Sequence, residues 1–301
     1  MMTVAVTGAT GYVGRFAVAE LQQRGIQVRA LARPNTDRSG FVQPIEWITG
    51  DLRSADALYQ LVQAADAVVH LAYEHVPGQY RNGEGHDLPT WLEANLNGSL
   101  RLLQAAQQAN VQRFIFLSSR AVFSRTEPGQ VLDELHPISP DTHYGAYKAA
   151  VEAFIQSFAH TGSLSTCSIR ATGIYGLTYP LWRSKWWELI QAVLHDEVIT
   201  SNRGGTEVHG ADVATVIATL LTRPTLDVDV LHLSDLYVTT REIVRLARDF
   251  AQHPGDLPPV SPAPTHVLVS RYLTDLGIML GGRPLLERTI ADLVQAAKAN
   301  A

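Results

Sequence analysis

The segment TVAVTGATGYVG, residues 3–14, decides the fold of this chain. It predicts a strand over 3–7, a glycine turn, and a helix over 12–24 with apolar residues at three-and-four spacing. The first N–H groups of such a helix lack partners inside it and lie at its positive end, so the turn favours a pyrophosphate. Glycine suits the sharp turn and the close approach of phosphate and helix. The residues expected to bind a dinucleotide here are Gly8, Thr10, Gly11, Tyr12, Val13 and Gly14.

Composition limits the class of protein. With 301 residues, 46% of them hydrophobic and 18% charged, the chain is typical of a globular protein with a full core. No stretch approaches the ~18 uninterrupted apolar residues of a membrane helix, and no secretory signal is visible, so a cytoplasmic protein without membrane contact is expected. A net charge of −5 argues against nucleic acid as a partner. No metal site is expected, and the single cysteine, Cys167, is expected to be a buried thiol.

Strand and helix patterns alternate along the first half of the chain. Strands are expected near 3–7, 27–32, 45–49, 67–72, 113–118 and 164–170. Helices are expected near 12–24, 54–63, 90–109 and 143–160. This order predicts an α/β fold with a doubly wound parallel sheet, whose ligands lie at the carboxyl ends of the strands.

The expected domains follow from this order. A Rossmann domain is expected over 1–175, with elements returning to it near 206–235, and a small C-terminal substrate-binding lobe is expected over 176–205 and 236–301. Two long polar loops, 75–90 and 124–142, have the length of functional rims or lids. A proline-rich segment, 253–265, fits a connection inside the lobe better than a boundary between domains.

The end of the second strand bears on the choice of cofactor. Sites that select NAD carry an acidic residue roughly 20 positions past the glycines, and here Ala32 and Arg33 stand in its place. A guanidinium suits a 2′-phosphate, so NADP is favoured, with NAD still possible. The alternative for Arg33 is a solvated surface side chain. Asp51, after the third strand, either caps the helix that follows or bonds the adenine amino group.

Tyr144 and Lys148 form the first candidate catalytic pair. They stand four residues apart at the start of an expected helix, so their side chains share a face. A phenol with a pKa of about 10 is a poor acid or base at neutral pH, and a neighbouring ammonium favours its phenolate. A chance Tyr and Lys at this spacing is the alternative interpretation.

Two hydroxyls, Ser118 and Ser119, close the strand FIFLSS. A hydroxyl at the carboxyl end of a parallel strand faces the ligand crevice, where it is able to hydrogen-bond a substrate oxygen. A serine at a strand end also often bonds its own backbone.

Together these motifs resemble the extended short-chain dehydrogenase/reductase family, which includes NAD(P)-dependent sugar epimerases, dehydratases and ketone reductases. The segments that carry the resemblance run nearly from end to end in the family's order: TGATGYVG, GDLRSADAL, VVHLAY, EANLNGSLRLLQAA, FLSSRAVF, YGAYKAAVE, IRATGIYG and VHGADVA. The spacing G-x-x-G-x-x-G of the glycine turn, which differs from the common G-x-G-x-x-G, is one of the family's specific marks.

The resemblance implies roles for individual residues. Tyr144 is implied as the general acid and base, Lys148 as the residue that lowers its pKa and holds the nicotinamide ribose, and Ser119 as the group that orients the substrate oxygen. Asn95 is implied in the geometry of the active-site helix or in a proton relay. Further residues implied at the cofactor are Leu52, Leu71, Ala72, Gly173 and Ile174, and His209 and Asp212 are implied near the substrate lobe.

The chain also departs from parts of the family. Arg120 and Ala121 replace the Asp-Glu pair of sugar-nucleotide dehydratases, so dehydration is not expected. Gly205 stands where members that hold a nucleotide-sugar pyrophosphate carry an Arg, with Arg203 only nearby, which argues against such a substrate. The aromatic segment TYPLWRSKWW, 178–187, fits either an apolar substrate pocket or the packed start of a helix.

The expected function is hydride transfer between NADP and a carbonyl or alcohol carbon of a small molecule. A sugar 4-epimerase, which uses the same residues, is the alternative within the enzymes, and a non-catalytic NADP-sensing protein is the alternative outside them. A homodimer is expected through the helices near 90–109 and 143–160, by way of Ala149, Ala153, Phe154 and Phe158, although the same residues also fit a core.

Overall fold

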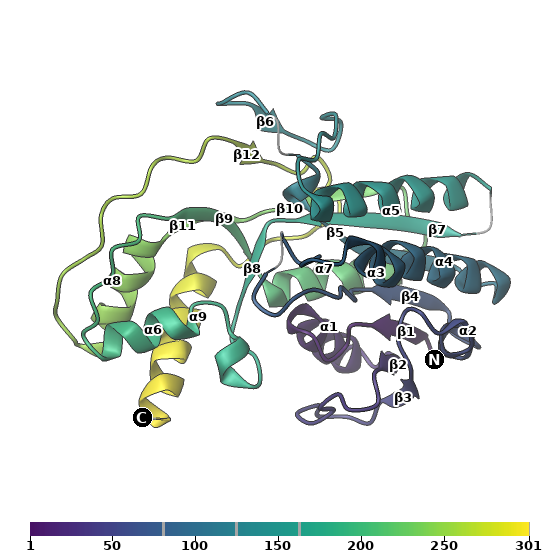
Figure 1. Ribbon diagram of the computed structural model, residues 1–301, viewed down its shortest axis with the longest axis horizontal. Helices are drawn as coiled ribbons and strands as arrows, with labels where there is room; N and C mark the ends of the chain where they lie inside the picture. Colours follow the sequence, from purple (N-terminus) through teal and green to yellow (C-terminus); the bar gives the residue numbers. More distant parts are fainter. Residues whose placement is uncertain (80–81, 124–125, 162–163, 301) are drawn as a thin grey trace.

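The computed structural model describes residues 1–79, 82–123, 126–161 and 164–300 (Figure 1). Residues 80–81 and 124–125, which belong to the two expected long loops, lie outside the described residues. The chain forms a larger Rossmann part and a smaller lobe beside it, which contains the helices α6 (Trp187–Leu194), α8 (Thr240–Ala251) and α9 (Gly282–Ala299).

The centre of the Rossmann part is a parallel sheet of seven strands in the order β10-β7-β5-β4-β1-β2-β3, as a doubly wound fold requires. Neighbouring strands run parallel throughout, with Val4 of β1 opposite Val28 of β2 and Ala67 of β4. The strands are β1 (Thr3–Thr7), β2 (Gln27–Ala32), β3 (Glu46–Thr49), β4 (Ala67–His70), β5 (Arg113–Ser119), β7 (Ser165–Ala171) and β10 (Val230–Leu233). The order reverses between β1 and β4, which places the crevice for a ligand at the carboxyl ends of these two strands.

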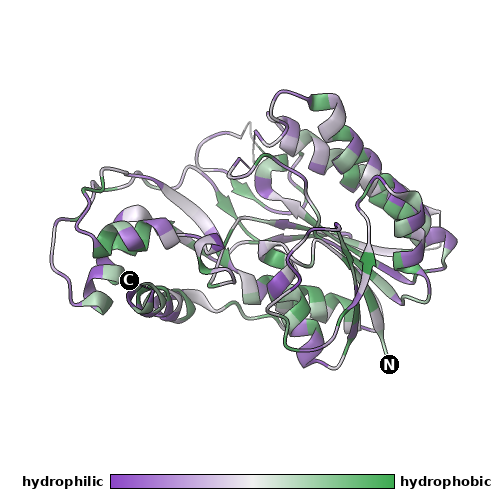
Figure 2. Ribbon diagram, turned by 60° about the horizontal axis from the view of Figure 1, so that its bottom comes forward, coloured by the Kyte–Doolittle hydropathy of each residue, from purple (hydrophilic) through white to green (hydrophobic). Residues whose placement is uncertain are grey.

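Helices cover both faces of this sheet because successive strand residues point to opposite sides. Val4 and Val6 pack on the face covered by α1 (Tyr12–Gln23) and α7 (Gly210–Thr222), and Ala5 packs on the other. That second face is covered by α2 (Ala55–Val62), α4 (Gly98–Gln108) and α5 (His143–His160). Hydrophobic residues concentrate where these helices meet the sheet (Figure 2). Cys167 is fully buried on the α1 and α7 side, which confirms the expected buried thiol.

Two expected elements differ in detail. The strand expected over 67–72 ends at His70, because its neighbour β1 ends at Thr7, where the glycine turn begins. The helix expected near 90–109 consists of α3 (Leu88–Leu92), a π-helical turn over Glu93–Asn97, and α4. Such π turns are frequent at functional sites, and this one contains Asn95.

The lobe has its own small sheet and core. β8 (Gly173–Tyr175), β9 (Gly204–His209) and β11 (Leu236–Thr239) form a three-stranded sheet in the order β11-β9-β8. Helices α6 (Trp187–Leu194), α8 (Thr240–Ala251) and α9 (Gly282–Ala299) share an apolar core with Tyr175 and Val238. β8 and β9, which the expected division leaves with the Rossmann domain, pair in this small sheet, whereas α7 packs on the large sheet and β10 belongs to it. The expected domain boundaries stay a prediction.

The second long loop is fixed by residues from far along the chain. β6 (Val131–Leu132) pairs in parallel with β12 (Val267–Leu268). The Glu134 carboxylate accepts hydrogen bonds from the backbone N–H groups of His232 and Arg271 and from the Ser270 hydroxyl. This loop is therefore joined both to β10 and to the segment before α9.

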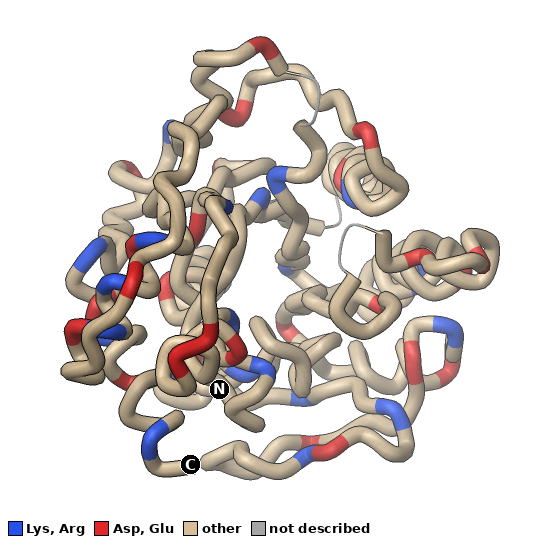
Figure 3. The backbone as a smooth tube through the Cα atoms, turned by 60° about the vertical axis from the view of Figure 1, so that its left-hand side comes forward, with Lys and Arg blue, Asp and Glu red and all other residues tan. Residues whose placement is uncertain are grey.

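Among the described residues, no helix combines the length and the hydrophobicity needed to cross a membrane. Acidic and basic residues are interspersed along most of the chain (Figure 3).

Candidate active site

The glycine turn between β1 and α1 has the shape that a dinucleotide requires. Gly8 has a φ of +76°, and a Cβ there would lie 2.7 Å from the backbone nitrogen of Ala72. A side chain at Gly14 would collide with the carbonyl oxygen of Gly8. A Cβ built at Gly11, by contrast, would have only that same carbonyl oxygen within 4 Å among the described residues other than its chain neighbours. Gly11 is also the N-cap of α1 and offers no side-chain cap, so these residues fit a pyrophosphate.

The remaining residues of the turn connect it to the lobe. The Tyr12 hydroxyl donates to the carbonyl oxygen of Gly176 at 2.8 Å and accepts from the backbone N–H of Lys185 at 3.2 Å. The carbonyl oxygen of Thr10 accepts from the Arg183 guanidinium at 3.2 Å. Val13 packs against the core beneath the turn. The Tyr12 side chain is thus used for packing and tethering, and only its backbone is left to face a ligand.

Arg33 and Asp51 lie past the ends of β2 and β3. The Arg33 side chain is exposed, and none of the described residues forms an ion pair with it. Asp51 accepts from the backbone N–H of Arg53 at 2.9 Å. The expected helix cap at Asp51 is wrong, because the hydroxyl of Ser54 caps α2 instead. Leu52 is buried in the core next to this turn.

Leu71 and Ala72 connect the cofactor side of the crevice to the catalytic side. A Cβ at Gly8 would touch the backbone of both residues, so the glycine turn rests directly on them. The next residue, Tyr73, places its ring centroid 5.0 Å from that of Tyr144. A continuous line of contacts therefore runs from the turn to the expected catalytic phenol.

Tyr144 and Lys148 lie one turn apart near the start of α5, as the spacing predicts. The Lys148 Nζ lies 5.8 Å from the ring centroid of Tyr144 and donates to the carbonyl oxygen of Leu117 at 2.6 Å. It also lies 4.5 Å from the ring centroid of Phe116. Thr142 begins the helix by accepting from the backbone N–H of Gly145.

Burial governs the charge of Lys148. The residue is 4% exposed, and this burial lowers the pKa of its ammonium from 10.5 to about 7, while the charge of Glu152 acts in the opposite direction. Glu152, one turn further along α5, is itself paired with Arg170 at 2.7 Å. A lysine whose pKa lies near neutral pH is well suited to respond to the ionisation of a nearby phenol.

The two serines at the end of β5 face opposite ways. Ser118 is buried and donates to the carboxylate of Glu152. The Oγ of Ser119 accepts from the backbone N–H of Ala121 at 3.1 Å, and the residue is partly exposed. The local backbone bond expected as an alternative is therefore present, yet the hydroxyl proton of Ser119 remains available as a donor.

Asn95 acts on the loop that follows β4. Its side-chain oxygen accepts from the backbone N–H of Glu74 at 2.8 Å, and its amide donates to the carbonyl oxygens of Glu74 and Trp91. The side chain is fully buried. These bonds support the expected role in active-site geometry, because Glu74 directly follows Tyr73.

A buried chain of hydrogen bonds, which the sequence did not reveal, runs from Thr7 of β1 to Asn95. The Oγ1 of Thr7 lies 2.6 Å from Nδ1 of His70, whose Nε2 lies 2.8 Å from the hydroxyl of Ser99. That hydroxyl donates to the carbonyl oxygen of Asn95 at 2.5 Å. Burial lowers the pKa of His70 to about 3, so the ring is neutral at ordinary pH.

Aromatic rings form the wall of the site around Tyr144. The Tyr73 ring stacks on that of Tyr147 at 5.9 Å between centroids and contacts His75 and Trp91. Close packing holds the following loop on this ring, since a Cβ at Gly83 would lie 2.6 Å from the Cβ of His75. Tyr73 occurs directly after VVHLA, and its aromatic character was the only sequence signal for this wall.

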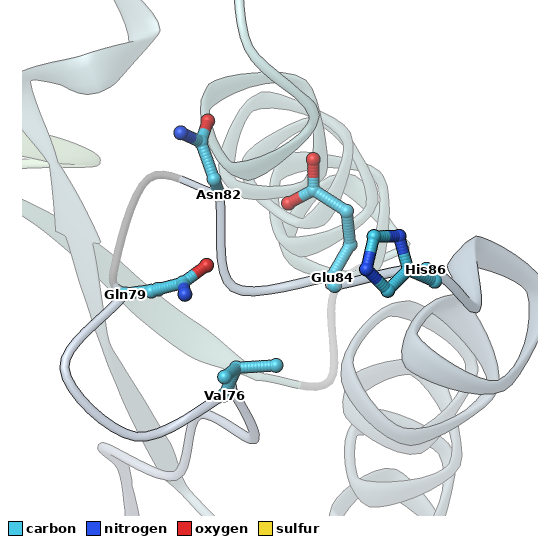
Figure 4. Close-up of a pocket in the computed structure, with 6 residues that line it drawn as sticks. Val76, Gln79, Asn82, Glu84 and His86 are labelled. Carbon is cyan, nitrogen blue, oxygen red and sulfur yellow. The ribbon is translucent and has the colours of Figure 1, made fainter.

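The loop after Tyr73 borders an open pocket of about 380 Å³ (Figure 4). Its lining residues are Val76, Gln79, Asn82, Glu84, Gly85 and His86. One carboxylate oxygen of Glu84 is buried with no hydrogen-bond partner among the described residues. The polar lining of this loop contrasts with the aromatic wall beside it.

Gly173 and Ile174 begin β8 on the lobe side. A side chain at Gly173 would lie within 2.7 Å of the Lys185 Nζ, which pairs with Glu207 at 2.5 Å. Burial raises the pKa of Glu207, and the Lys185 charge opposes that rise. Gly173 is thus needed to accommodate this ion pair, and Ile174 packs toward the main core.

The aromatic segment 178–187 divides into two kinds of residue, and the expected packed start of a helix holds for Trp186 and Trp187, while the expected substrate pocket stays a prediction. Trp186 and Trp187 pack on the lobe core, with Trp186 stacked on Tyr175 at 5.1 Å. Tyr179 and Trp182 are 62% and 66% exposed.

His209 and Asp212 lie at the start of α7, as expected. Nδ1 of His209 accepts from the backbone N–H of Ala211, and Asp212 accepts from that of Gly281. Burial lowers the pKa of His209 to about 4. Both side chains are therefore engaged in backbone capping or bridging.

Comparisons with known proteins agree with this geometry. A UDP-glucose 4-epimerase of Streptomyces lividans is 30% identical over 219 residues, which cover 70% of this chain and 64% of that protein. A 3 beta-hydroxysteroid dehydrogenase/Delta 5-->4-isomerase of Mycobacterium tuberculosis is 30% identical over 182 residues, 58% of this chain and 47% of that protein. The chain thus spans about half the length of curated relatives such as this dehydrogenase.

Solved structures share the fold. The crystal structure of a UDP-glucose 4-epimerase of Thermus thermophilus in complex with NAD has a TM-score of 0.80 at 23% identity, covering 98% of this chain and 100% of that one. A sequence model described as the NAD dependent epimerase/dehydratase family matches residues 4–230, from the glycine turn through Tyr144 and Lys148 to β10. The chain therefore belongs to the NAD dependent epimerase/dehydratase family.

Proposed function

We propose that this protein transfers a hydride between a nicotinamide cofactor and a carbonyl or alcohol carbon of a small molecule. The observation that carries the proposal is the line of contacts from the glycine turn through Ala72 and Tyr73 to Tyr144, with Lys148 on the same helix face. It brings a pyrophosphate cradle and a phenol with an adjacent ammonium to one crevice. When bound, the nicotinamide supplies or accepts the hydride.

The protein's own groups handle the proton. The Tyr144 hydroxyl donates a proton to the substrate oxygen during reduction and accepts it during oxidation. The Lys148 ammonium, fixed by the Leu117 carbonyl, favours the phenolate form of Tyr144, and the phenolate in turn favours the ammonium. The Ser119 hydroxyl donates to the substrate oxygen and holds it toward Tyr144. Asn95 fixes the loop that carries Tyr73.

The variant Tyr144→Phe tests this assignment. We expect it to lose about 10²–10⁴-fold in kcat while binding the nicotinamide cofactor as the wild type does. Tyr59→Phe, which removes the hydroxyl of a 52% exposed tyrosine on α2, is the matched control and should be fully active. A fully active Tyr144→Phe enzyme would show that the proton passes through another group.

NADP is the proposed cofactor within this NAD-dependent family. Support comes from Arg33, exposed past the end of β2 where NAD-selective sites carry an acid. We expect Arg33→Ala to weaken NADP⁺ binding by about 10–100-fold and NAD⁺ binding little, measured by calorimetry. Equal effects on the two cofactors would favour NAD as the natural partner.

The substrate proposed is a small molecule with an apolar ring. The partly buried ring of Tyr73, which packs on the buried rings of Trp91 and Tyr147, and the exposed rings of Tyr179 and Trp182 support it. A sugar 4-epimerase is the second candidate, because the Streptomyces lividans epimerase aligns with 70% of this chain. Nicotinamide absorbance separates the two candidates, since an epimerase consumes no cofactor over many turnovers. Binding of NADPH without reduction of any carbonyl in a broad panel would favour the NADP-sensing protein instead.

We also propose a homodimer through α4 and α5 and a cytoplasmic location. Ala153 and Phe154 are exposed on α5, and Phe154 is 45% exposed, as a helix-pairing surface requires. Ala149 and Phe158, expected in the same surface, pack within the chain instead. In sedimentation experiments the wild type should be a dimer and Phe154→Glu a monomer.

A further inference from the structure

Arg183 lies in the lobe but contacts the glycine turn of the Rossmann part. It ends a short 3-10 turn, Leu181–Arg183, and its guanidinium donates to the carbonyl oxygen of Thr10, 173 residues earlier, at 3.2 Å. The Trp182 ring supports the guanidinium from the side, at 5.2 Å between Cζ and the ring centroid. Arg183 is exposed, and Thr10 is the one hydrogen-bond partner of its guanidinium in the part of the chain described, so donors of its fork remain open to a ligand.

The segment that carries Arg183 is held in place from both sides. The Tyr12 hydroxyl bonds Gly176 before it and Lys185 after it. The Ser184 hydroxyl bonds the backbone of Thr178 across the segment. Arg183 is therefore presented to the turn by a loop that is tethered at both ends.

The charges near this contact are two guanidinium groups and one exposed carboxylate. Arg183 approaches Arg15 of α1: burial lowers the pKa of Arg15, the Asp37 charge raises it, and the Arg183 charge lowers it. One exposed carboxylate, Asp37, faces both guanidinium groups, and its pKa is lowered mainly by hydrogen bonds from Ser39 and further by the two arginines. Two guanidinium groups thus share a single carboxylate beside the N-terminus of α1, so a second anion placed there is electrostatically favoured.

We infer that Arg183 binds the pyrophosphate of the dinucleotide, so that the substrate lobe contributes a cofactor-binding residue. The inference rests on the proposed function, because it requires a dinucleotide at the glycine turn. A planar guanidinium forms two parallel hydrogen bonds with phosphate oxygens, which a carbonyl oxygen cannot offer. Cofactor binding then replaces the Arg183–Thr10 bond and draws the exposed Trp182 toward the cofactor.

Binding of three probes to wild type, Arg183→Ala, Arg183→Lys and Arg33→Ala tests the inference. ADP-ribose carries the pyrophosphate, adenosine 2′-monophosphate carries only the ribose phosphate, and NADP⁺ carries both. We expect Arg183→Ala to weaken ADP-ribose and NADP⁺ about 10–100-fold by calorimetry and to leave adenosine 2′-monophosphate unchanged. Arg183→Lys should recover part of the loss, because it keeps the charge but not the fork. Arg33→Ala should weaken the binding of adenosine 2′-monophosphate and leave that of ADP-ribose unchanged.

Two controls keep the outcomes distinct. Arg288→Ala removes one exposed charge from α9 in the lobe and should bind all three probes as the wild type does. Hydrogen exchange of residues 178–185 should slow when ADP-ribose binds the wild type and change less in Arg183→Ala. Unchanged ADP-ribose affinity in Arg183→Ala would overturn the inference alone. Failure of the wild type to bind any dinucleotide would overturn the inference and the proposed function together.

Discussion

The Rossmann wall of the active site and its lobe wall are built in opposite ways. On the Rossmann wall, Lys148 is 4% exposed and Asn95 is fully buried, and both are fixed by bonds to backbone atoms. On the lobe wall, Tyr179, Trp182 and Arg183 present exposed side chains. The groups proposed to handle protons are thus set in position by folding, whereas the side chains proposed to meet ligands keep freedom to adjust.

Among these variants, Lys148→Met, which changes the Rossmann wall, should lower kcat the most. Loss of the ammonium removes the group that favours the Tyr144 phenolate, so we expect kcat to fall by about 10²–10⁴-fold. The measurement is steady-state kinetics together with cofactor affinity. A variant with normal kcat would mean that Lys148 serves packing alone.

The same variant should also change the pH dependence of stability. In the native protein the Lys148 pKa is about 7 and in the unfolded chain about 10.5, so between these values the unfolded chain holds the extra proton. The free energy of unfolding of the wild type therefore rises with pH across this window, by at most about 1.4 kcal/mol per pH unit. In urea unfolding, the free energy of unfolding of Lys148→Met should rise less with pH than that of the wild type. Below pH 7 the variant should be the more stable of the two.

Trp186 and Trp182 sharpen the comparison, because they stand four residues apart in one aromatic segment. Trp186 stacks on Tyr175 and packs on the lobe core, so Trp186→Ala should cost roughly 2–4 kcal/mol of unfolding free energy. Thermal unfolding measures this loss. A change below about 0.5 kcal/mol, typical of surface positions, would assign Trp186 to the ligand instead.

Trp182→Ala should have the smallest effect on the fold and act only on ligands. With its side chain 66% exposed, we expect a stability change within about 0.5 kcal/mol and a several-fold rise in KM with little change in kcat. Initial rates over a range of substrate concentrations test this. A fall in kcat alone would place Trp182 in the chemical step.

Much of the Rossmann wall was predictable because its signals are local. The glycine turn, the parallel sheet and the shared face of Tyr144 and Lys148 all follow from short-range spacing. The alternation of strand residues also explains why Ser118 is buried on Glu152 while Ser119 is partly exposed. The roles of these residues in catalysis and cofactor binding remain predictions.

The lobe wall could not be predicted in the same way. Arg183 meets Thr10 only because two parts of the chain dock, and no local pattern records that contact. Two details of the Rossmann part also escaped prediction. Asn95, which bonds Glu74, lies in a π-helical turn inside a sequence with ordinary helical spacing. Ser54 and not Asp51 caps α2, because the helix begins at Ala55 and Ser54 occupies the N-cap position.

The pairing of β6 with β12 has a consequence for the order in which the molecule assembles. During synthesis from the N-terminus, Glu134 must wait for Ser270, 136 residues later, before the loop ahead of α5 acquires its partners. Contacts of such long sequence separation form late, since the entropy of closing the intervening chain must be overcome first. The helix α5, which carries the proposed catalytic pair, is thus complete on the growing chain well before the loop that precedes it has all its partners, and activity should emerge only as the last quarter of the chain folds.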